Sequence, residues 1–336
     1  MQYVTTRSDR VLFNECDPLY ADTAPDGGYF VPAVFPKLTR EEIISLQQKS
    51  YGDIIADVLN RFFAVQLTGW DVDLHIGRNS ARIASLGSKT YIAEMWHNPT
   101  GTLQTATKSL YACVTGSDSS KLPTQWFQIA ADIAYLFALY GELSRTGVCV
   151  GGTKFDVSVN SDDMILPLVA CYAREMGLPI GTILISCNDS VIWDLIHHGE
   201  SNASSAAPTV IAGIERLVHL KVGGEAIETY LTSITNKRTY FVDEELIPDF
   251  GDGLFCVVSG AQRYQQIIGS FAMANRYILD PCSAQCVNAL QDYRAKTGAN
   301  HQTLIISATT PLKCIADITA ATGLNEQSIA ELLKRQ

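Results

Sequence analysis

The alternation of helical and strand-like segments is the feature of this sequence that most restricts its fold. Residues 164–187 read "MILPLVACYAREMGLPIGTILISC", a helical pattern that ends at Gly177 and Pro179 and is followed by a continuous apolar strand. Strand-like runs recur at 253–260 and 301–310, each before a further helical stretch. This alternation predicts an α/β fold, with a mostly parallel sheet flanked by helices.

Polar residues follow three of the predicted strands. Ligands bind at the carboxyl ends of the strands in such sheets, so Asn98, Asn188 and Thr309 are candidate pocket residues. The stretch "YIAEMWHNPT" also places His97 and Thr100 after a strand. These side chains either position a substrate or cofactor phosphate or belong to an ordinary structural turn.

Composition and charge exclude several classes of protein. The net charge is −10, and Lys and Arg form no cluster, which argues against nucleic-acid binding. No apolar run reaches the roughly 18 to 20 residues of a membrane span, and "MQYVTTRSDRVLF" lacks a signal core, so we expect a cytoplasmic protein that does not bind membranes. The nine cysteines form no CxxC, and His197-His198 has no third ligand, so no metal site is expected.

One predicted helix is apolar on nearly every face. It spans residues 125–143, and Asp132 is the single charge in it before Glu142, near its C-terminal end. Such a helix lies either deep in the core or at a subunit interface.

Eight segments resemble those of one enzyme family. In chain order they are "YVTTRSD", "APDGGYFVPAVFPKLTREEIISL", "YIAEMWHNPT", "QWFQIAADIAYLF", "YAREMGLPI", "IERL", "LDPCSA" and "SATTPLKC", between residues 3 and 317. The ordered set resembles the threonine synthases, pyridoxal-phosphate enzymes of fold type II that eliminate phosphate from phosphohomoserine and add water. The resemblance implies an N-terminal threonine-synthase-like region at 1–90 and a large α/β domain at 91–336.

The sequence departs from the family pattern at the positions that bind or react with the cofactor. In the family, H-G-P-T is followed by L-A-F-K-D, whose lysine forms the Schiff base, and here "GTLQT" puts Gln104 at that position. An amide forms no imine. The weak substitute is Lys108, which lies about 6 Å further along a helix and is aimed elsewhere.

The family's phosphate-binding and ring-binding motifs are also altered. The Gly-Asn-Phe-Gly loop aligns with a segment that begins Asp162-Asp163, and two carboxylates there would repel a phosphate. The threonine that meets the pyridine nitrogen aligns with Ala308, next to Thr309. Residues 105–124 stand where the family has its small mobile domain, so we expect that domain to be largely missing.

Two hypotheses follow for function. In the first, the chain is a non-catalytic pseudoenzyme without a cofactor. It would act as a binding or assembly partner that pairs with itself, with an active threonine synthase or with another protein, and the 125–143 helix is a candidate surface for that pairing. In the second, it is a pyridoxal-phosphate-dependent lyase with residual activity, or it runs a new reaction with His97, Lys108, Asp162 or Asp163. The carboxylates of Asp162 and Asp163 could also bind a cation or a basic ligand.

Overall fold

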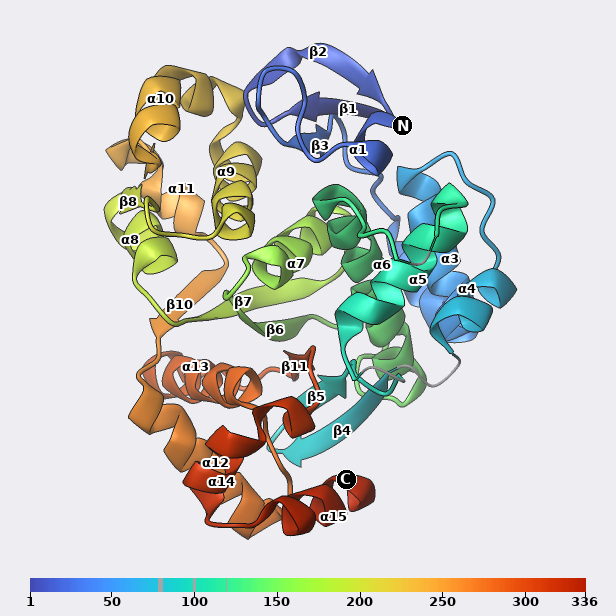
Figure 1. Ribbon diagram of the computed structural model, residues 1–336, viewed down its shortest axis with the longest axis vertical. Coiled ribbons are helices and arrows are strands. Elements are labelled where there is room, and N and C mark those ends of the chain that lie inside the picture. Colours follow the sequence, from blue (N-terminus) through green and yellow to red (C-terminus); the bar gives the residue numbers. More distant parts are fainter. Residues whose placement is uncertain (78–80, 99–100, 119) are drawn as a thin grey trace.

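A six-stranded sheet runs through the centre of the computed structural model, which describes residues 1–77, 81–98, 101–118 and 120–336 (Figure 1). The strand order is β10-β7-β6-β11-β5-β4, and every neighbouring pair is parallel except β4 and β5. The predicted mostly parallel α/β sheet is therefore confirmed. The strands are β4 Arg82–Gly87, β5 Thr90–Glu94, β6 Phe155–Asn160, β7 Ile180–Cys187, β10 Leu254–Val258 and β11 Thr303–Ser307.

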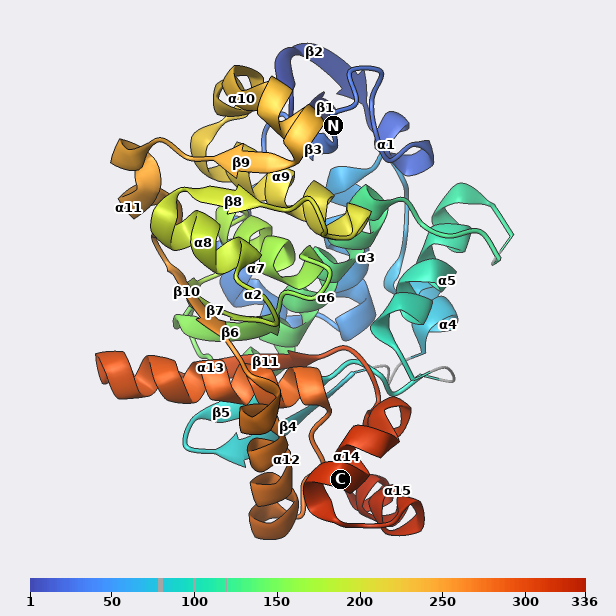
Figure 2. The same ribbon diagram turned by 60° about the vertical axis from the view of Figure 1, so that its left-hand side comes forward.

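Helices cover both faces of this sheet, since successive strand side chains point to opposite sides. Leu304 and Ile306 of β11 join the core under α6 and α7, whereas Ile305 joins the core under α12 and α13 (Figure 2). These helices are α5 Leu103–Thr115, α6 Gln125–Arg145, α7 Ile165–Glu175, α8 Val191–His198, α12 Ala261–Asn275, α13 Pro281–Thr297, α14 Ile315–Thr322 and α15 Glu326–Arg335.

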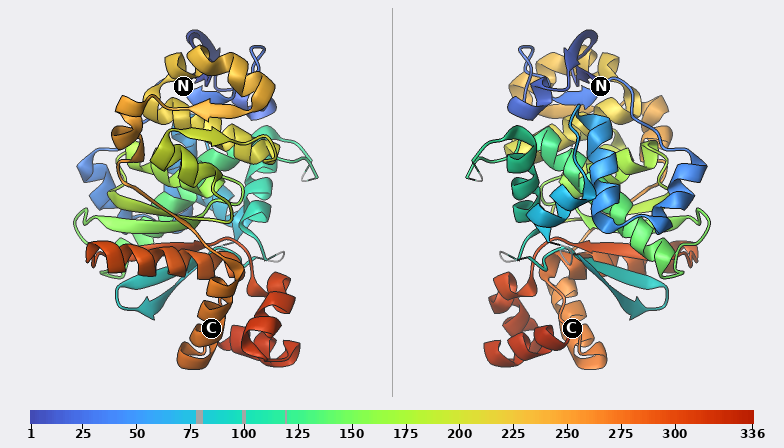
Figure 3. Two further views of the ribbon diagram at one scale, coloured as in Figure 1. Left: turned by 90° about the vertical axis from the view of Figure 1, so that its left-hand side faces the viewer. Right: turned by 90° about the vertical axis from the view of Figure 1, so that its right-hand side faces the viewer.

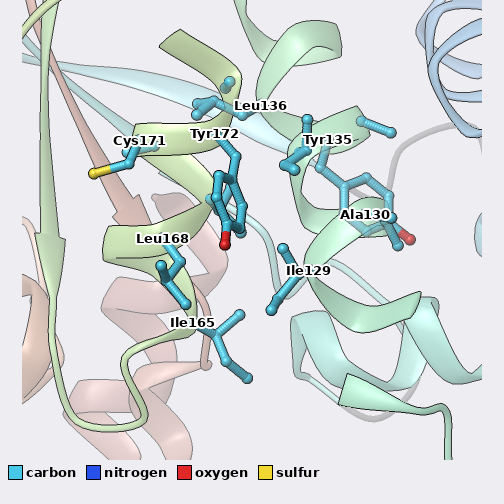
Figure 4. Packing of buried hydrophobic residues seen from close by; sticks show 14 of the residues in the cluster. Ile129, Ala130, Tyr135, Leu136, Ile165, Leu168, Cys171 and Tyr172 are labelled. Carbon is cyan, nitrogen blue, oxygen red and sulfur yellow. The ribbon is translucent and has the colours of Figure 1, made fainter. Parts of the chain in front are cut away.

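Helix α6 lies inside the molecule. It packs against α3, α5 and α7, and nearly all of its side chains are buried within this one chain. Figure 4 shows core residues of α6 (Ile129, Ala130, Tyr135 and Leu136) and of α7 (Ile165, Leu168, Cys171 and Tyr172), with the ring of Tyr172 between the two helices. The expectation that a partner docks on the 125–143 helix is therefore wrong, because the apolar surface of this helix is already used in the core.

The N-terminal region places a small sheet at one end of the molecule and packs its helix α3 against α6 (Figure 3). Its antiparallel sheet has the order β2-β1-β3, and a capping box between Thr39 and Glu42 starts α2. The strand β4, at residues 82–87, already belongs to the large sheet. The elements are β1 Gln2–Thr5, β2 Ser8–Asn14, α1 Asp17–Tyr20, β3 Phe30–Pro32, α2 Arg40–Ser45, α3 Tyr51–Phe62 and α4 Gly69–Ile76.

The segment between α8 and β10 packs beside this N-terminal sheet, where α10 contacts β2. Its elements are β8 Glu200–Asn202, α9 Pro208–Val222, α10 Gly224–Lys237, β9 Thr239–Phe241 and α11 Ile247–Gly251. Short 3-10 turns are found at Leu46–Gln48, Glu244–Leu246 and Pro311–Cys314. None of the helices in the described part of the chain combines the length and the hydropathy that a membrane span needs.

Residues 105–124 form most of α5 and the connection to α6. In the described part of this connection there is neither a strand nor a further helix. The absence of the family's small domain stays a prediction, as does the domain boundary at residue 90.

Candidate functional site

Three connections meet at the carboxyl end of the central strands. The segment after β5 runs beside the segment after β11, because the N–H of Leu103 donates to the carbonyl of Ala308 at 2.9 Å and the N–H of Thr310 donates to the carbonyl of Gly101 at 3.0 Å. Gly101 has a φ of 68°, and a Cβ at this position would lie 2.7 Å from Cγ2 of Thr310. The close approach therefore requires glycine at residue 101.

A cavity of about 190 Å³ lies at this junction. The start of α5, the middle of α6, the turn before α7, the start of α13 and the end of β11 all contribute side chains to it. The lining residues are Thr102, Leu103, Gln104, Gln128, Asp132, Asn160, Asp162, Asp163, Ile165, Leu166, Asp280, Cys282, Ile306, Ala308 and Thr309. The parallel topology therefore assembles one pocket from segments far apart in sequence.

Five of the predicted pocket residues line this cavity: Gln104, Asp162, Asp163, Ala308 and Thr309. Gln104 and Asp162 are exposed and lie at its rim, whereas Asp132 and Asp280 are 4% and 3% exposed and lie deeper.

The turn before α7 provides its own anion. Oδ1 of Asp163 accepts a 3.0 Å hydrogen bond from the N–H of Ile165, the first residue of the helix, and Oδ1 of Asn160 accepts one of 2.8 Å from the N–H of Asp162. A helix N-terminus usually attracts an external anion because its first N–H groups are free. Here a carboxylate of the chain already occupies part of that place.

The cavity is acidic, and its carboxyl groups resist ionisation. Burial raises the pKa of Asp280. Burial and the charge of Asp162 raise the pKa of Asp163, and partial desolvation at the rim raises the pKa of Asp162. The pKa of Asp132 is raised well above 3.8, mainly by burial and then by the charge of Asp163. Burial also raises the pKa of the Cys282 thiol, which donates to Oδ2 of Asp162 at 3.3 Å. This thiol is therefore a hydrogen-bond donor rather than a nucleophile.

The described lining does not fit pyridoxal phosphate. It contains four aspartates and no Lys, Arg or His, so a phosphate would meet only negative formal charges. The amide of Gln104 has no amine for an imine. Lys108 is not among the lining residues. Its charge instead acts on Asp118, beyond the end of α5, where hydrogen bonds from Ser120 and then the charge of Lys108 lower the pKa of that carboxyl group.

His97 has a structural environment outside the described lining. Its Nε2 lies 2.6 Å from Oε2 of Glu94, and its ring stacks on Trp96 with 4.3 Å between the ring centroids. Glu94 is fully buried and also accepts a 2.5 Å hydrogen bond from the hydroxyl of Tyr277. His97 therefore partners a buried carboxylate at the end of β5.

The remaining predicted residues support the pocket or lie elsewhere. Asn98 donates to the carbonyl of Thr102 at 2.7 Å and so orders the turn before α5. Asn188 donates to Asp162 and accepts from Nε2 of Gln285 at 2.8 Å, behind the rim of the cavity. Thr100 lies outside the described residues.

Among the described residues, no three His, Cys, Asp or Glu side chains gather in a geometry suited to a metal ion. His197 and His198 lie in the last turn of α8, before Gly199.

Among the lining residues that sequence reasoning did not place in the pocket are Gln128, Asp132, Asp280 and Cys282. The signal for Asp132 was present, since a lone acid in an apolar helix is expensive to bury and marks a candidate site. For the other three, no local pattern predicts that α6 and the start of α13 face one cavity.

Comparison with known proteins agrees with this architecture. A sequence profile described as "Threonine synthase N terminus" matches residues 2–77. A threonine synthase of Pseudomonas aeruginosa is 29% identical over 108 residues, a match that spans 30% of this chain and only 23% of that relative.

Solved structures of threonine synthases share the fold over nearly the whole chain. The pyridoxal-phosphate-bound enzyme from Brucella melitensis superposes with a TM-score of 0.80 at 17% identity, covering 100% of this chain and 95% of the other. The yeast enzyme gives 0.81 at 15% identity, covering 99% and 94%, and the Escherichia coli enzyme gives 0.71 at 14% identity, covering 98% and 94%. Residues 2–77 therefore resemble the N-terminal part of the threonine synthases, and the chain as a whole shares the threonine synthase fold.

Proposed function

We propose that this chain is a non-catalytic member of the threonine synthase family that acts as a binding or assembly partner. The observation that carries the proposal is the chemistry of the cavity. Gln104 lies at its rim, none of the described lining residues is a lysine, and all of the charged ones are aspartates. Without an amine at the cavity, the chain cannot hold pyridoxal phosphate as an imine.

The alternative is a pyridoxal-phosphate-dependent threonine synthase-type lyase with residual or altered activity. The observation in its favour is the likeness to the pyridoxal-phosphate-bound enzyme of Brucella melitensis over the whole chain. This alternative requires another amine, and Lys108 is the nearest lysine in sequence to residue 104.

Borohydride trapping separates the two functions. The protein is incubated with pyridoxal phosphate, reduced with sodium borohydride and analysed by intact mass and peptide mapping. We expect no stoichiometric adduct, because lysines outside the cavity react only weakly and without selectivity. A one-to-one adduct that is lost in Lys108→Ala but kept in Lys37→Ala, which changes an exposed lysine, would overturn the proposal.

A gain-of-function series tests which loss matters. Gln104→Lys restores an amine at the rim, but we expect this variant to remain largely untrapped, because Asp162 and Asp163 still repel the phosphate. Adding Asp162→Gly and Asp163→Gly should increase trapping at residue 104. Full trapping of Gln104→Lys alone would show that the carboxylates do not exclude the cofactor.

A further inference from the structure

We propose that the acidic cavity binds a small organic cation, a primary amine or diamine that carries no carboxylate or phosphate of its own. This inference rests on the proposed function, since it requires a cavity that is not filled by pyridoxal phosphate. It assigns a ligand class to the same site.

The first step of the argument is the charge of the cavity. Oδ2 of Asp280 accepts from the hydroxyls of Ser283 and Ser307, Asp162 accepts from Asn188 and from a thiol, and Asp163 accepts from a backbone N–H. All of these donors are neutral. Within the described lining no cation balances the carboxylates, so a positively charged ligand is the species that this cavity favours.

The second step is the burial of Asp132, a carboxylate that lies inside the cavity and not at its rim. It is 4% exposed, lies on α6 and faces the cavity. Its Oδ1 accepts a long hydrogen bond of 3.3 Å from the hydroxyl of Thr107, and its Oδ2 accepts none from the described part of the chain. A buried carboxylate without a counter-charge is costly, and a ligand ammonium in hydrogen-bond contact would offset that cost.

Neutral acceptors surround this carboxylate. The side chains of Gln104, Gln128 and Thr309 line the cavity and make no hydrogen bond to other described residues. A primary ammonium has three N–H donors and needs several acceptors at once. The set of one buried carboxylate with amide and hydroxyl oxygens meets that need.

Two other ligand classes fit less well. A bare metal ion would need a cluster of ligating side chains, and the described residues form none. An amino acid would bring its own carboxylate among four aspartates, with no basic side chain in the described lining to receive it. The cavity volume of about 190 Å³ is several times the ~30 Å³ that one water occupies in the liquid, so a ligand of several non-hydrogen atoms can enter.

Calorimetric titration with three probes of similar length tests the inference at pH 8 and low salt. We expect 1,4-diaminobutane to bind saturably at one site, 1,4-butanediol not to bind, and ornithine to bind at least tenfold more weakly than the diamine. Equal binding of diamine and diol, or no binding of the diamine, would overturn the inference.

The variant that carries the test is Asp132→Asn, which keeps the shape and removes the charge. We expect at least a tenfold loss of diamine affinity. The matched control is Asp249→Asn, which removes one exposed carboxylate outside the lining and should leave the affinity unchanged. If Asp132→Asn retains the affinity of the native protein, the inference fails. If that variant does not fold, Asp163→Asn replaces it, because asparagine can still accept from the N–H of Ile165.

The diamine titration and the borohydride experiment test different proposals, and their contradicting outcomes can be told apart. Trapping of pyridoxal phosphate by the native chain would overturn the proposed function. Absence of diamine binding, in a protein that also traps no pyridoxal phosphate, would overturn only the ligand class proposed here.

Discussion

Asp132 is a carboxylate in a helix whose other interior positions are almost all apolar. The titratable and polar groups around it are Asp163 before α7, Tyr51 of α3, Tyr135 of α6 and Thr107 of α5. None of these groups is cationic, so burial and the charge of Asp163 raise its pKa. The buried carboxylate of Asp132 therefore lowers the stability of the native protein, a cost that is common at functional sites.

We expect Asp132→Asn to stabilise the protein at neutral pH. Because the pKa of Asp132 is raised in the folded state, the folded protein binds its proton more tightly than the unfolded chain does. The stabilisation that comes from this bound proton is fully present when the pH is below 3.8, the ordinary pKa of aspartate. It is lost as the pH rises through the pKa that Asp132 has in the folded protein. A tenfold difference in proton affinity between the folded and unfolded states corresponds to about 1.4 kcal/mol.

Urea denaturation of both proteins between pH 4 and pH 8 measures this effect. The difference in unfolding free energy between Asp132→Asn and the native protein should be small at pH 4 and should grow with pH. The other aspartates of the cavity are present in both proteins, so they cancel to first order. A variant that is less stable than the native protein at pH 8 would contradict the expected sign.

Helix α9 lies against the turn that forms one wall of the cavity. A Cβ placed on Gly213 would lie 2.3 Å from Cβ of Met164, a fully buried residue with a φ of 60°. Both atoms are attached directly to backbone, so neither can move away alone. The glycine in α9 therefore allows the close packing of α9 on this turn.

We expect Gly213→Ala to lower the unfolding free energy. Overpacking costs about 1–3 kcal/mol, whereas the higher helix propensity of alanine returns at most about 1 kcal/mol. Chemical denaturation measures the difference. The control is Gly251→Ala, where the nearest atom to the new Cβ, Cγ2 of Ile196, would be 3.5 Å away. Equal losses in the two variants would argue against steric contact at Met164 as the cause.

The N-terminal sheet is joined to α9 by a buried ionic contact. Glu215 is fully buried, and its carboxylate accepts from the hydroxyl of Thr6 at 2.5 Å and from Nε and Nη2 of Arg7 at 3.0 and 3.3 Å. Figure 1 shows β1, β2 and β3 beside α9 and α10. This contact fixes the two parts of the molecule relative to each other through charge-assisted hydrogen bonds.

We expect Glu215→Ala to destabilise the protein by about 3–5 kcal/mol, because it leaves the Arg7 guanidinium partly buried without its partner. Thermal and chemical unfolding check the magnitude, and limited proteolysis checks release of the N-terminal segment. The same interface provides a control in Glu228→Ala, since Arg10 and Glu228 are 3.7 Å apart and largely exposed. That variant should cost at most about 1 kcal/mol. Similar losses in both variants would refute the assignment to Glu215.

Local signals in the sequence predicted the elements well. Thr39 and Glu42 form the capping box that starts α2, and Gly177, with a φ of 102°, follows the end of α7 before the apolar strand β7. These features depend on residues a few positions apart, so the sequence itself contains the cause. The alternation of such elements also predicted the parallel sheet.

The sequence by itself determined the alternation of helices and strands, the mostly parallel sheet and the identity of Gln104, Asp162 and Asp163. Only the tertiary structure decided that α6 is a core helix, that His97 partners Glu94, and that Asp132 faces the same cavity as Gln104. Periodicity shows that a helix has apolar faces but not what covers them. The cavity exists because side chains from distant segments converge, and that convergence is set by how the whole chain packs.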